Sequence, residues 1–208
     1  MDWPLDPMTL MWIQVATGAT GMLTLVYAVR WLGRKLGYVL DVTAYFSPKG
    51  GCQDAIVREL KSARREILVL AYSFTADPLT FGLVEAKKRG LTVEIVLDKS
   101  NELEHYSDLH FFIENSMDVK IDHDHAIAHN KVIIIDKSTV ITGSYNFTNQ
   151  AENENAENLL IIKGHPELVS RYRENFFHHR DHAKPAQIRE ADPAKERRFG
   201  GHGQHKAA

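Results

Sequence analysis

The order of apolar segments predicts an α/β domain: a mixed β-sheet flanked by helices on both faces, preceded by an N-terminal transmembrane helix. Two observations lead to this fold class. Short β-branched runs alternate with amphipathic runs of helical period, and two further apolar runs then follow each other across a tight turn. Strands separated by helices pair in parallel and hairpin strands pair antiparallel, so we expect a mixed sheet.

The composition divides the 208 residues into one domain with appendages. The polar end of the chain has no periodicity and is expected to be disordered. The five parts are a short N-terminal segment (1–7), a transmembrane helix (8–29), a juxtamembrane connector (30–41), a globular domain (42–182) and a disordered tail (183–208).

The transmembrane interpretation rests on a stretch without charge. Residues 8–29 contain no charged side chain, and a helix of that length spans about 33 Å, enough to cross the hydrocarbon core of a bilayer. Trp12 lies near one end, and Tyr27 and Trp31 lie near the other, as interfacial anchors do. A cleaved signal peptide and a buried soluble helix are the alternatives.

The flanking charges bear on both the signal peptide and the orientation. Asp2 and Asp6 make the preceding segment acidic, unlike the start of a signal peptide, and no clear small-x-small cleavage site follows. Arg30, Arg34 and Lys35 follow the span, so the positive-inside rule places the domain in the cytoplasm. A periplasmic domain is the alternative.

Local signals define the elements of the domain. A Pro-Lys-Gly-Gly turn ends the first strand. The run 67–74 is apolar almost throughout, as in a strand covered on both faces. Asp77 and Pro78 form an N-cap and first helical residue, and Gly90 ends that helix. Lys137–Ser138 is interpreted as the tight turn of the hairpin. The expected strands are 42–46, 67–74, 91–97, 119–121, 131–136, 140–143 and 159–162, and the expected helices are 54–65, 77–89, 103–115 and 166–179.

One motif carries the chemistry. It has the form H-x-K-x4-D-x6-G-S-x-N and consists of His129, Lys131, Asp136, Gly143, Ser144 and Asn146. His129 and Lys131 are two residues apart, so on a strand they project to the same face. Ser144 and Asn146 repeat that spacing, and all four side chains could meet at one phosphate. Asp136 has the opposite parity and is interpreted as a structural ion-pair partner. A lone H-x-K could be accidental on a core strand, but the complete pattern is specific.

These residues resemble the signature of the phospholipase D superfamily, from about residue 44 to residue 177. The nearest likeness is to small bacterial endonucleases with one motif per chain, which residues 70–76 and 85–90 also resemble. Membrane-anchored mitochondrial cardiolipin hydrolases of the Zucchini type are similar in layout. They carry a zinc-binding insertion after the first strand, where this chain has only residues 47–51, and this favours the bacterial, metal-free branch.

The residue types suit phosphodiester cleavage. Histidine titrates near neutrality, so His129 can act as nucleophile or as proton donor. Lys131 supplies a positive charge, and Ser144 and Asn146 supply neutral donors for the nonbridging oxygens. A nucleophilic imidazole also needs an acceptor on its other nitrogen.

Three glutamates could be that acceptor: Glu152, Glu154 and Glu157. The resemblance implies Glu157, the residue just before the strand that follows the G-S-x-N segment. It also implies that Asp136 and Gly143 are structural residues of the motif and that no cofactor or metal is needed.

The chain contains one such motif and no internal repeat. The resemblance therefore implies a homodimer, in which one His129 forms a phosphohistidine and the second protonates the leaving group.

Other histidines could ligate zinc. His123 and His125 form one group, and His178, His179 and His182 form another. We interpret them as substrate-contacting or solvated, because the first group is expected at the lip of the site and the relatives need no ligands there. The lone Cys52 excludes a cysteine-rich zinc cluster.

The resemblance makes nucleic acid, DNA or RNA, the expected substrate, cleaved by a membrane-anchored endonuclease. The net charge of −2 gives no global basic field, so single strands are favoured. Local basic residues form either solvated helix faces or contacts to the nucleic acid backbone: Lys61, Arg64, Lys87, Lys88 and Arg89. The alternatives are a phospholipase D or cardiolipin hydrolase, another phosphodiester transfer such as phosphatidyl transfer, and a catalytically silent scaffold or nucleic-acid-binding module.

Overall fold

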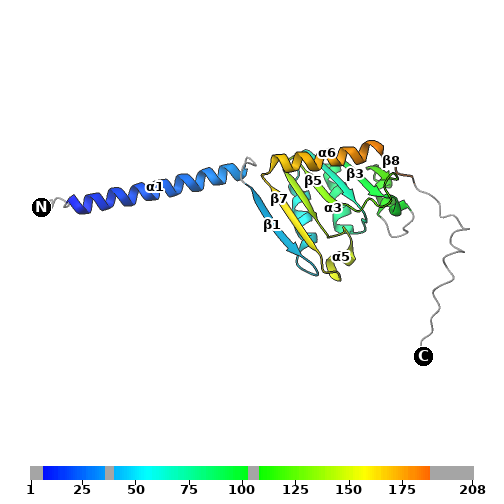
Figure 1. The fold of residues 1–208 in the computed structure, drawn as a ribbon, viewed down its shortest axis with the longest axis horizontal. Helices are drawn as coiled ribbons and strands as arrows, with labels where there is room; N and C mark the ends of the chain where they lie inside the picture. Colours follow the sequence, from blue (N-terminus) through cyan, green and yellow to red (C-terminus); the bar gives the residue numbers. More distant parts are fainter. Residues whose placement is uncertain (1–6, 36–39, 103–107, 188–208) are drawn as a thin grey trace, which may run out of the picture.

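The computed structural model describes residues 7–35, 40–102 and 108–187, and its centre is a mixed sheet of eight strands (Figure 1). The strand order is β1-β7-β6-β5-β2-β3-β4-β8. Neighbours among β2, β3 and β4 are parallel, and the other pairs are antiparallel. The strands are β1 (Asp41–Phe46), β2 (Glu66–Ala71), β3 (Thr92–Asp98), β4 (Asp118–Asp122), β5 (Lys131–Ile135), β6 (Thr139–Gly143), β7 (Asn158–Lys163) and β8 (Lys184–Pro185). The expected mixed sheet is confirmed.

Helices cover both faces of this sheet, as the apolar run through β2 predicts. Alternate residues of β2 belong to two different cores: Ile67 and Val69 to one, Leu68 and Leu70 to the other. Helix α6 packs on the second of these and crosses that face of the sheet (Figure 1). The helices are α1 (Pro7–Lys35), α2 (Cys52–Ser62), α3 (Asp77–Lys88), α4 (Leu109–Glu114), α5 (Asn149–Asn153) and α6 (Pro166–His182), with a 3-10 turn η1 (Lys99–Glu102).

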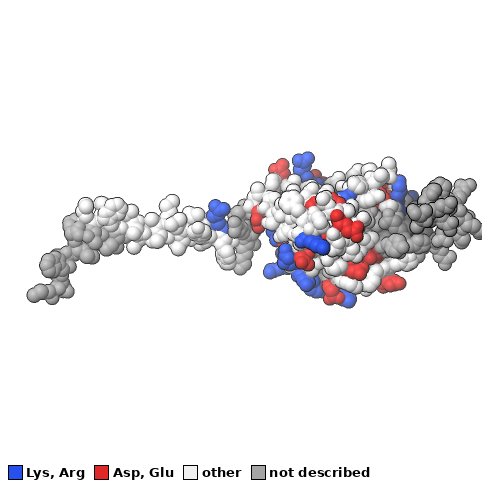
Figure 2. Space-filling model, turned by 90° about the horizontal axis from the view of Figure 1, so that it is seen from below, with Lys and Arg blue, Asp and Glu red and all other residues white. Residues whose placement is uncertain are grey.

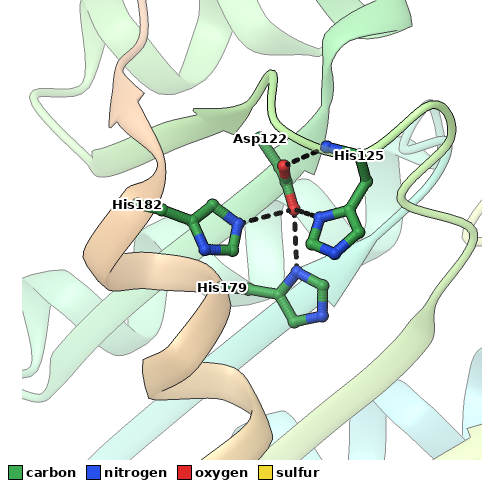
Figure 3. Close-up of side chains that lie close together, drawn as sticks. All are labelled: Asp122, His125, His179 and His182. Carbon is green, nitrogen blue, oxygen red and sulfur yellow. Dashed lines mark hydrogen bonds and ion pairs between the residues drawn. The ribbon is translucent and has the colours of Figure 1, made fainter.

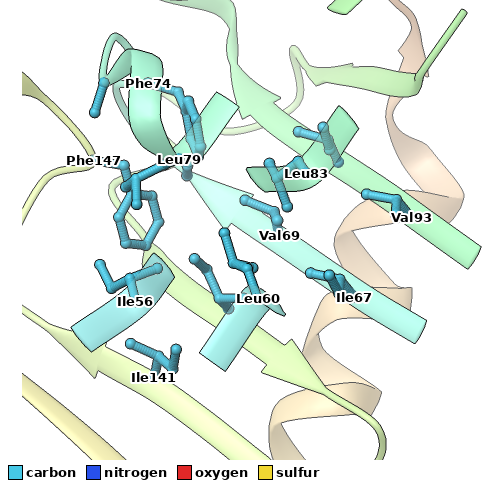
Figure 4. Close-up of a cluster of buried hydrophobic side chains, with 14 of the residues drawn as sticks. Ile56, Leu60, Ile67, Val69, Phe74, Leu79, Leu83, Val93, Ile141 and Phe147 are labelled. Carbon is cyan, nitrogen blue, oxygen red and sulfur yellow. The ribbon is translucent and has the colours of Figure 1, made fainter. Parts of the chain in front are cut away.

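The larger core lies between the sheet and helices α2, α3 and α4. Ile56 and Leu60 of α2 meet Leu79 and Leu83 of α3 over the strands (Figure 4). All four are fully buried, and burying such a side chain stabilises the fold by about 1.5–3 kcal/mol. This core holds α2 and α3 against the face from which the motif strand β5 presents its odd-numbered residues.

The hairpin turn lies one residue earlier than expected. Asp136 and Lys137 have φ of 53° and 58°, and the Ser138 amide donates to the Ile135 carbonyl at 3.0 Å. Two central residues with positive φ make a turn whose twist matches that of the paired strands. The expected Lys137–Ser138 turn is therefore wrong by one position.

The ends of two helices also differ in detail. Ala76, and not Asp77, is the N-cap of α3, and Asp77 is the first helical residue. The negative charge of Asp77 at this position stabilises the helix through its dipole. Gly90, with φ of 88°, follows the end of α3 as predicted. The helix expected at 103–115 is described from Leu109, because residues 103–107 lie outside the described part of the chain.

The chain stays ordered beyond the expected end of the domain. Helix α6 runs to His182, and β8 then pairs with β4. The Ala186 amide donates to the Val119 carbonyl at 2.9 Å. The expectation of disorder is thus wrong for 183–187, and 188–208 lie outside the described residues. The short helix α5, capped by the Thr148 hydroxyl, was not foreseen.

Helix α1 extends away from the sheet (Figure 1). Its 29 residues continue past residue 29 into the expected connector. Over Gln14–Gly33 the mean hydropathy is 1.2 and none of the segment is buried in the fold. By length and composition, this segment is able to cross a membrane.

Candidate active site

Except for Asp136, the motif residues lie at one end of the sheet, where β2 ends and β5 begins. Lys131 is the first residue of β5 and pairs with Ala71, the last residue of β2. The Tyr72 amide then donates to the Asn130 carbonyl at 2.8 Å, which extends the pairing to the residue after His129. The sheet thus holds His129 at the rim of the strands.

Lys131 is a nearly buried cation. Like Ile133 on the same strand, it faces the core under α2 and α3, and only 6% of it is exposed. Its Nζ donates to the His129 carbonyl at 3.2 Å. Burial lowers the pKa of Lys131, and the negative charge of Glu157 opposes that shift. A desolvated charge of this kind acts strongly on a phosphate brought beside it.

His129 is exposed, and its ring packs against a residue outside the motif. The centroids of the His129 and Tyr72 rings are 4.7 Å apart, and Lys131 Nζ lies 5.0 Å from the Tyr72 centroid. Tyr72 therefore touches both motif side chains, which converge as their spacing predicts. Sequence reasoning missed Tyr72, although an aromatic residue just after a buried strand was a usable signal.

A second missed residue, Asn158, fixes the start of the G-S-x-N segment. The Ser144 hydroxyl accepts hydrogen bonds from the Asn158 amide at 3.1 Å and from its Nδ2 at 3.2 Å. A Cβ at position 143 would lie 2.2 Å from the Asn158 carbonyl oxygen, so Gly143 is required there. Ser144 is thus held directly after β6, beside the first residue of β7.

Asn146 carries a buried polar atom that is left open. Its Oδ1 is buried and finds no hydrogen-bond partner among the described residues. Such a group costs free energy, so its place in the fold is better explained by a ligand than by stability. The adjacent Phe147 carbonyl accepts from the Thr75 amide at 2.9 Å and ties this segment to the end of β2.

The three candidate glutamates differ in their surroundings. The Glu157 amide donates to the Ser47 hydroxyl at 3.2 Å, and its Oε1 accepts from Asn155 at 3.2 Å. Its negative charge acts on Lys131, but within the described chain no hydrogen bond joins Glu157 to His129.

Glu152 has other partners: its Oε2 accepts from the Gln53 amide and the Tyr145 hydroxyl, both at 2.9 Å. Glu154 is exposed.

Asp136 lies at the far end of β5 and does not form the expected ion pair. Its carboxylate accepts from the backbone amides of Arg64 at 2.8 Å, Arg65 at 2.7 Å and Glu66 at 3.1 Å. It therefore joins the β5–β6 turn to the entrance of β2. The structural interpretation is retained, but the partners are amides and not a cation.

The basic residues of α2 and α3 lie at that same far end. Helix α3 ends just before β3, whose first residue pairs with the first residue of β2. Arg89 Nη2 donates to the Leu60 and Ala63 carbonyls, at 2.9 and 3.3 Å. The cations expected to follow the nucleic acid backbone therefore lie remote from His129, because the two helices run away from it, and their contact with a nucleic acid stays a prediction. The residues concerned are Lys61, Arg64, Lys87, Lys88 and Arg89.

The histidines cluster in the structure differently from their two groups in the sequence. His123 Nε2 lies 3.1 Å from a Glu102 carboxylate oxygen. His125, His179 and His182 instead meet around Asp122, and this second cluster is separate from the motif.

The comparisons with known proteins agree with this geometry. The family model described as "Cardiolipin synthase, PLD-like domain" matches residues 56–180. A protein named phospholipase D from Rickettsia typhi is 42% identical over 137 residues, which cover 66% of this chain and 67% of that protein. The mitochondrial cardiolipin hydrolase of Mus musculus is 30% identical over 121 residues, 58% of this chain and 54% of that one.

The fold itself matches a crystal structure of a phospholipase D family member, Nuc from Salmonella typhimurium. The TM-score is 0.69 at 33% identity, and the match covers 72% of this chain and 99% of that one.

Proposed function

This chain belongs to the phospholipase D family, and from that membership we propose a membrane-anchored endonuclease that cleaves nucleic acid through a phosphohistidine on His129. The supporting observation is the convergence of an exposed imidazole and a buried cation on Tyr72. Together they present a nucleophile and a positive charge at one open edge of the sheet.

The first step forms a bond between His129 and phosphorus and breaks the bond to the leaving oxygen. Lys131, Ser144 and Asn146 hold the nonbridging oxygens, and each well-placed donor contributes about 3–4 kcal/mol to the transition state. A proton goes to the leaving oxygen. Water then attacks the phosphohistidine, which releases a phosphomonoester end and restores the imidazole. Glu157 orients His129 in this scheme, and its negative charge also acts on Lys131. These residues supply the charge stabilisation without a metal.

A homodimer completes the site. In-line displacement needs a nucleophile and an acid on opposite sides of phosphorus, and each chain contributes one such histidine. In an isologous pair the two sites meet at the symmetry axis, so His129 of the partner subunit donates the proton. Ile127, 60% exposed beside His129, supports close packing of a second copy there.

Helix α1 is the proposed membrane anchor. Its described surface is uncharged along most of the helix, with basic side chains only near the end close to the domain (Figure 2). The excess of Arg30, Arg34 and Lys35 over the acidic residues before the span places the domain in the cytoplasm.

A single-stranded nucleic acid is the proposed substrate. Short loops and an exposed His129 leave room for a polymer at the edge of the sheet. Acidic and basic side chains are interspersed on the face in Figure 2, and the net charge is −2, so the broad attraction that duplex binding uses is weak. Lys49 is exposed beside the site. Its amide donates to the Glu152 carbonyl at 2.8 Å, and the amide of Ser47, two residues earlier, donates to the Glu157 carbonyl at 3.0 Å.

Phospholipid is the second candidate substrate. The relatives named phospholipase D and cardiolipin hydrolase favour it, and the anchor would hold the site near lipid headgroups.

One experiment separates these substrates. The full chain in detergent is incubated with labelled DNA, RNA or cardiolipin, with EDTA added just before the substrate. We expect cleavage of single-stranded nucleic acid, a phosphate adduct on His129, and a loss of at least ~10³-fold in His129→Asn. His110→Asn, a change of an exposed histidine on α4, is the control and should retain activity.

Three outcomes would count against the proposal. An adduct on another residue would contradict the assigned nucleophile. Loss of activity in EDTA that Mg²⁺ restores would contradict the metal-free reaction. Cardiolipin hydrolysis without cleavage of any nucleic acid would establish the second candidate.

A further inference from the structure

A four-residue cluster lies apart from the motif, on the face of the sheet that α6 covers. Asp122 is the last residue of β4, His125 lies in the following loop, and His179 and His182 lie on the last turn of α6. Figure 3 shows the three rings turned toward one carboxylate. Asp122 Oδ2 lies 2.9 Å from His125 Nδ1, 2.7 Å from His179 Nδ1 and 3.2 Å from His182 Nε2.

Hydrogen bonding alone accounts poorly for this arrangement. A carboxylate oxygen offers two lone pairs, yet three ring nitrogens face Oδ2. The His182 Nε2 contact at 3.2 Å lacks hydrogen-bond geometry, so this buried nitrogen has no hydrogen-bond partner within the described residues. The other oxygen, Oδ1, is already used by the backbone amides of Asp124 at 3.1 Å and His125 at 3.3 Å.

The dimensions fit a metal ion instead. One atom from each of the four side chains lies within 4.8 Å of the others. Zn²⁺ binds imidazole nitrogen and carboxylate oxygen at about 2.0–2.2 Å, so tetrahedral ligand atoms are about 3.3 Å apart. The oxygen-to-nitrogen distances of 2.7–3.2 Å need only a small expansion. The amides on Oδ1 would orient the carboxylate, as groups behind a metal ligand do.

The donor set also indicates the class of metal. Imidazole suits Zn²⁺ and similar transition ions, whereas Mg²⁺ and Ca²⁺ prefer oxygen ligands. Four protein ligands make a closed, structural site. Three of the four side chains are well buried: Asp122 is fully buried, and His179 and His182 are 10% and 20% exposed. The side chain of His125 is 44% exposed and forms the solvent-facing side of the cluster.

We propose that Asp122, His125, His179 and His182 bind a structural Zn²⁺-type ion that fastens the end of α6 to β4 and to the β4–β5 loop. This loop, residues 123–130, runs from the ion to His129. Its far end is held at Ala128, whose amide donates to Asp98 at 2.7 Å. The ion would thus position the loop that carries His129 without touching the phosphate. Only this last consequence rests on the proposed function.

The test is the metal content of the full chain, purified in detergent without a histidine tag and dialysed after exposure to ZnCl₂. We expect about one Zn²⁺ per chain in the wild type and at least tenfold less in His179→Gln and His182→Gln. His178→Gln is the matched control, since His178 is exposed on the same helix turn and is not one of the four residues. It should retain the metal.

Two further measurements keep the test decisive if a variant fails to fold. The wild type loaded with Co²⁺ should show the intense visible absorption of a tetrahedral site, and removal of Zn²⁺ should lower its melting temperature by at least about 5 °C. His129→Asn should bind Zn²⁺ like the wild type, so the metal site is tested independently of the proposed reaction. The proposal is overturned if the wild type retains no more Zn²⁺ than His179→Gln, or if Co²⁺ shows no tetrahedral spectrum.

Discussion

Lys131, a proposed site residue, illustrates the cost of burying a cation in the fold. A cation that is 6% exposed and whose Nζ donates to one carbonyl has lost most of its hydration, and the lowered pKa of Lys131 expresses that cost. The same desolvation strengthens its attraction to a phosphate. A lysine at this position therefore costs stability, and its proposed contact with a phosphate would account for it.

Replacing Lys131 with Met should therefore stabilise the domain and inactivate it. We expect a rise in melting temperature of about 2–4 °C, the shift that ~1 kcal/mol produces in a domain of this size. Activity should fall about 10²–10³-fold, as for the loss of one charge-stabilising donor. Calorimetry and initial rates check both, with Lys61→Met on the exposed surface of α2 as control.

The difference in stability between Lys131→Met and the wild type should depend on pH in a defined direction. The pKa of Lys131 is lower in the folded than in the unfolded chain, so between the two values the unfolded state binds more protons and wild-type stability rises with pH. The advantage of Lys131→Met should shrink as the pH rises through this alkaline window. A variant less stable than the wild type at neutral pH would contradict the explanation.

The β5–β6 hairpin shows what a single carboxylate does at the level of elements. Asp136 takes a positive φ at the turn and receives the three amides that lead into β2. One side chain therefore sets both the hairpin twist and the register of the neighbouring strand. It lies at the end of β5 remote from His129, so its effect is on stability.

Asp136→Ala should lower the free energy of unfolding by about 1–3 kcal/mol, because three backbone amides, two of them exposed and one partly buried, lose a charged acceptor. Asp136→Asn should cost less, since asparagine keeps one oxygen and tolerates positive φ. Denaturant unfolding measures both, and Ser138→Ala in the same turn is the control. Initial rates at low temperature should be unchanged. An Asp136→Ala domain as stable as the wild type would show that the amides are satisfied by water.

At the scale of the whole molecule, the proposed site belongs to two chains. If both histidines act on one phosphate, a mixed dimer of wild type and His129→Asn is inactive. Activity at constant total protein should then fall with the square of the wild-type fraction, to about one quarter in an equal mixture. Co-expression with two affinity tags provides the mixed species, and His110→Asn serves as control.

A second mixture probes the same arrangement. His129→Ala with Lys131→Ala should not restore full activity, because each composite site still lacks one group. A linear fall in the first experiment, or a fully active monomer in sedimentation, would contradict the shared site.

The orientation in the membrane needs a reporter other than the native cysteine. Cys52 is buried, and burial, with the negative charge of Glu152, raises the pKa of its thiol to about 11. The thiolate that reacts with maleimides is therefore scarce at neutral pH.

An exposed Ser138→Cys should remain unlabelled by an impermeant maleimide on intact cells and react after lysis, because the positive-inside rule places the domain in the cytoplasm. Leu5→Cys, on the other side of the span, should react before lysis. The reverse pattern would place the domain in the periplasm.

The sequence by itself determined the features that depend on short spacing. The period of two along a strand put His129 and Lys131 on one face, and the alternation of apolar and amphipathic runs predicted the mixed sheet. The same spacing argument selected Ser144 and Asn146, and their role at a phosphate stays a prediction.

Only the tertiary structure decided which distant residues meet. Tyr72, Asn158 and the amides around Asp136 come from neighbouring strands, and strand order is not encoded in local spacing. The basic ends of α2 and α3 proved remote from His129 because each helix runs back to the opposite end of the sheet. The residues around Asp122 are up to 60 positions apart in the sequence, and they converge because α6 ends over the sheet and the chain then pairs as β8 with β4.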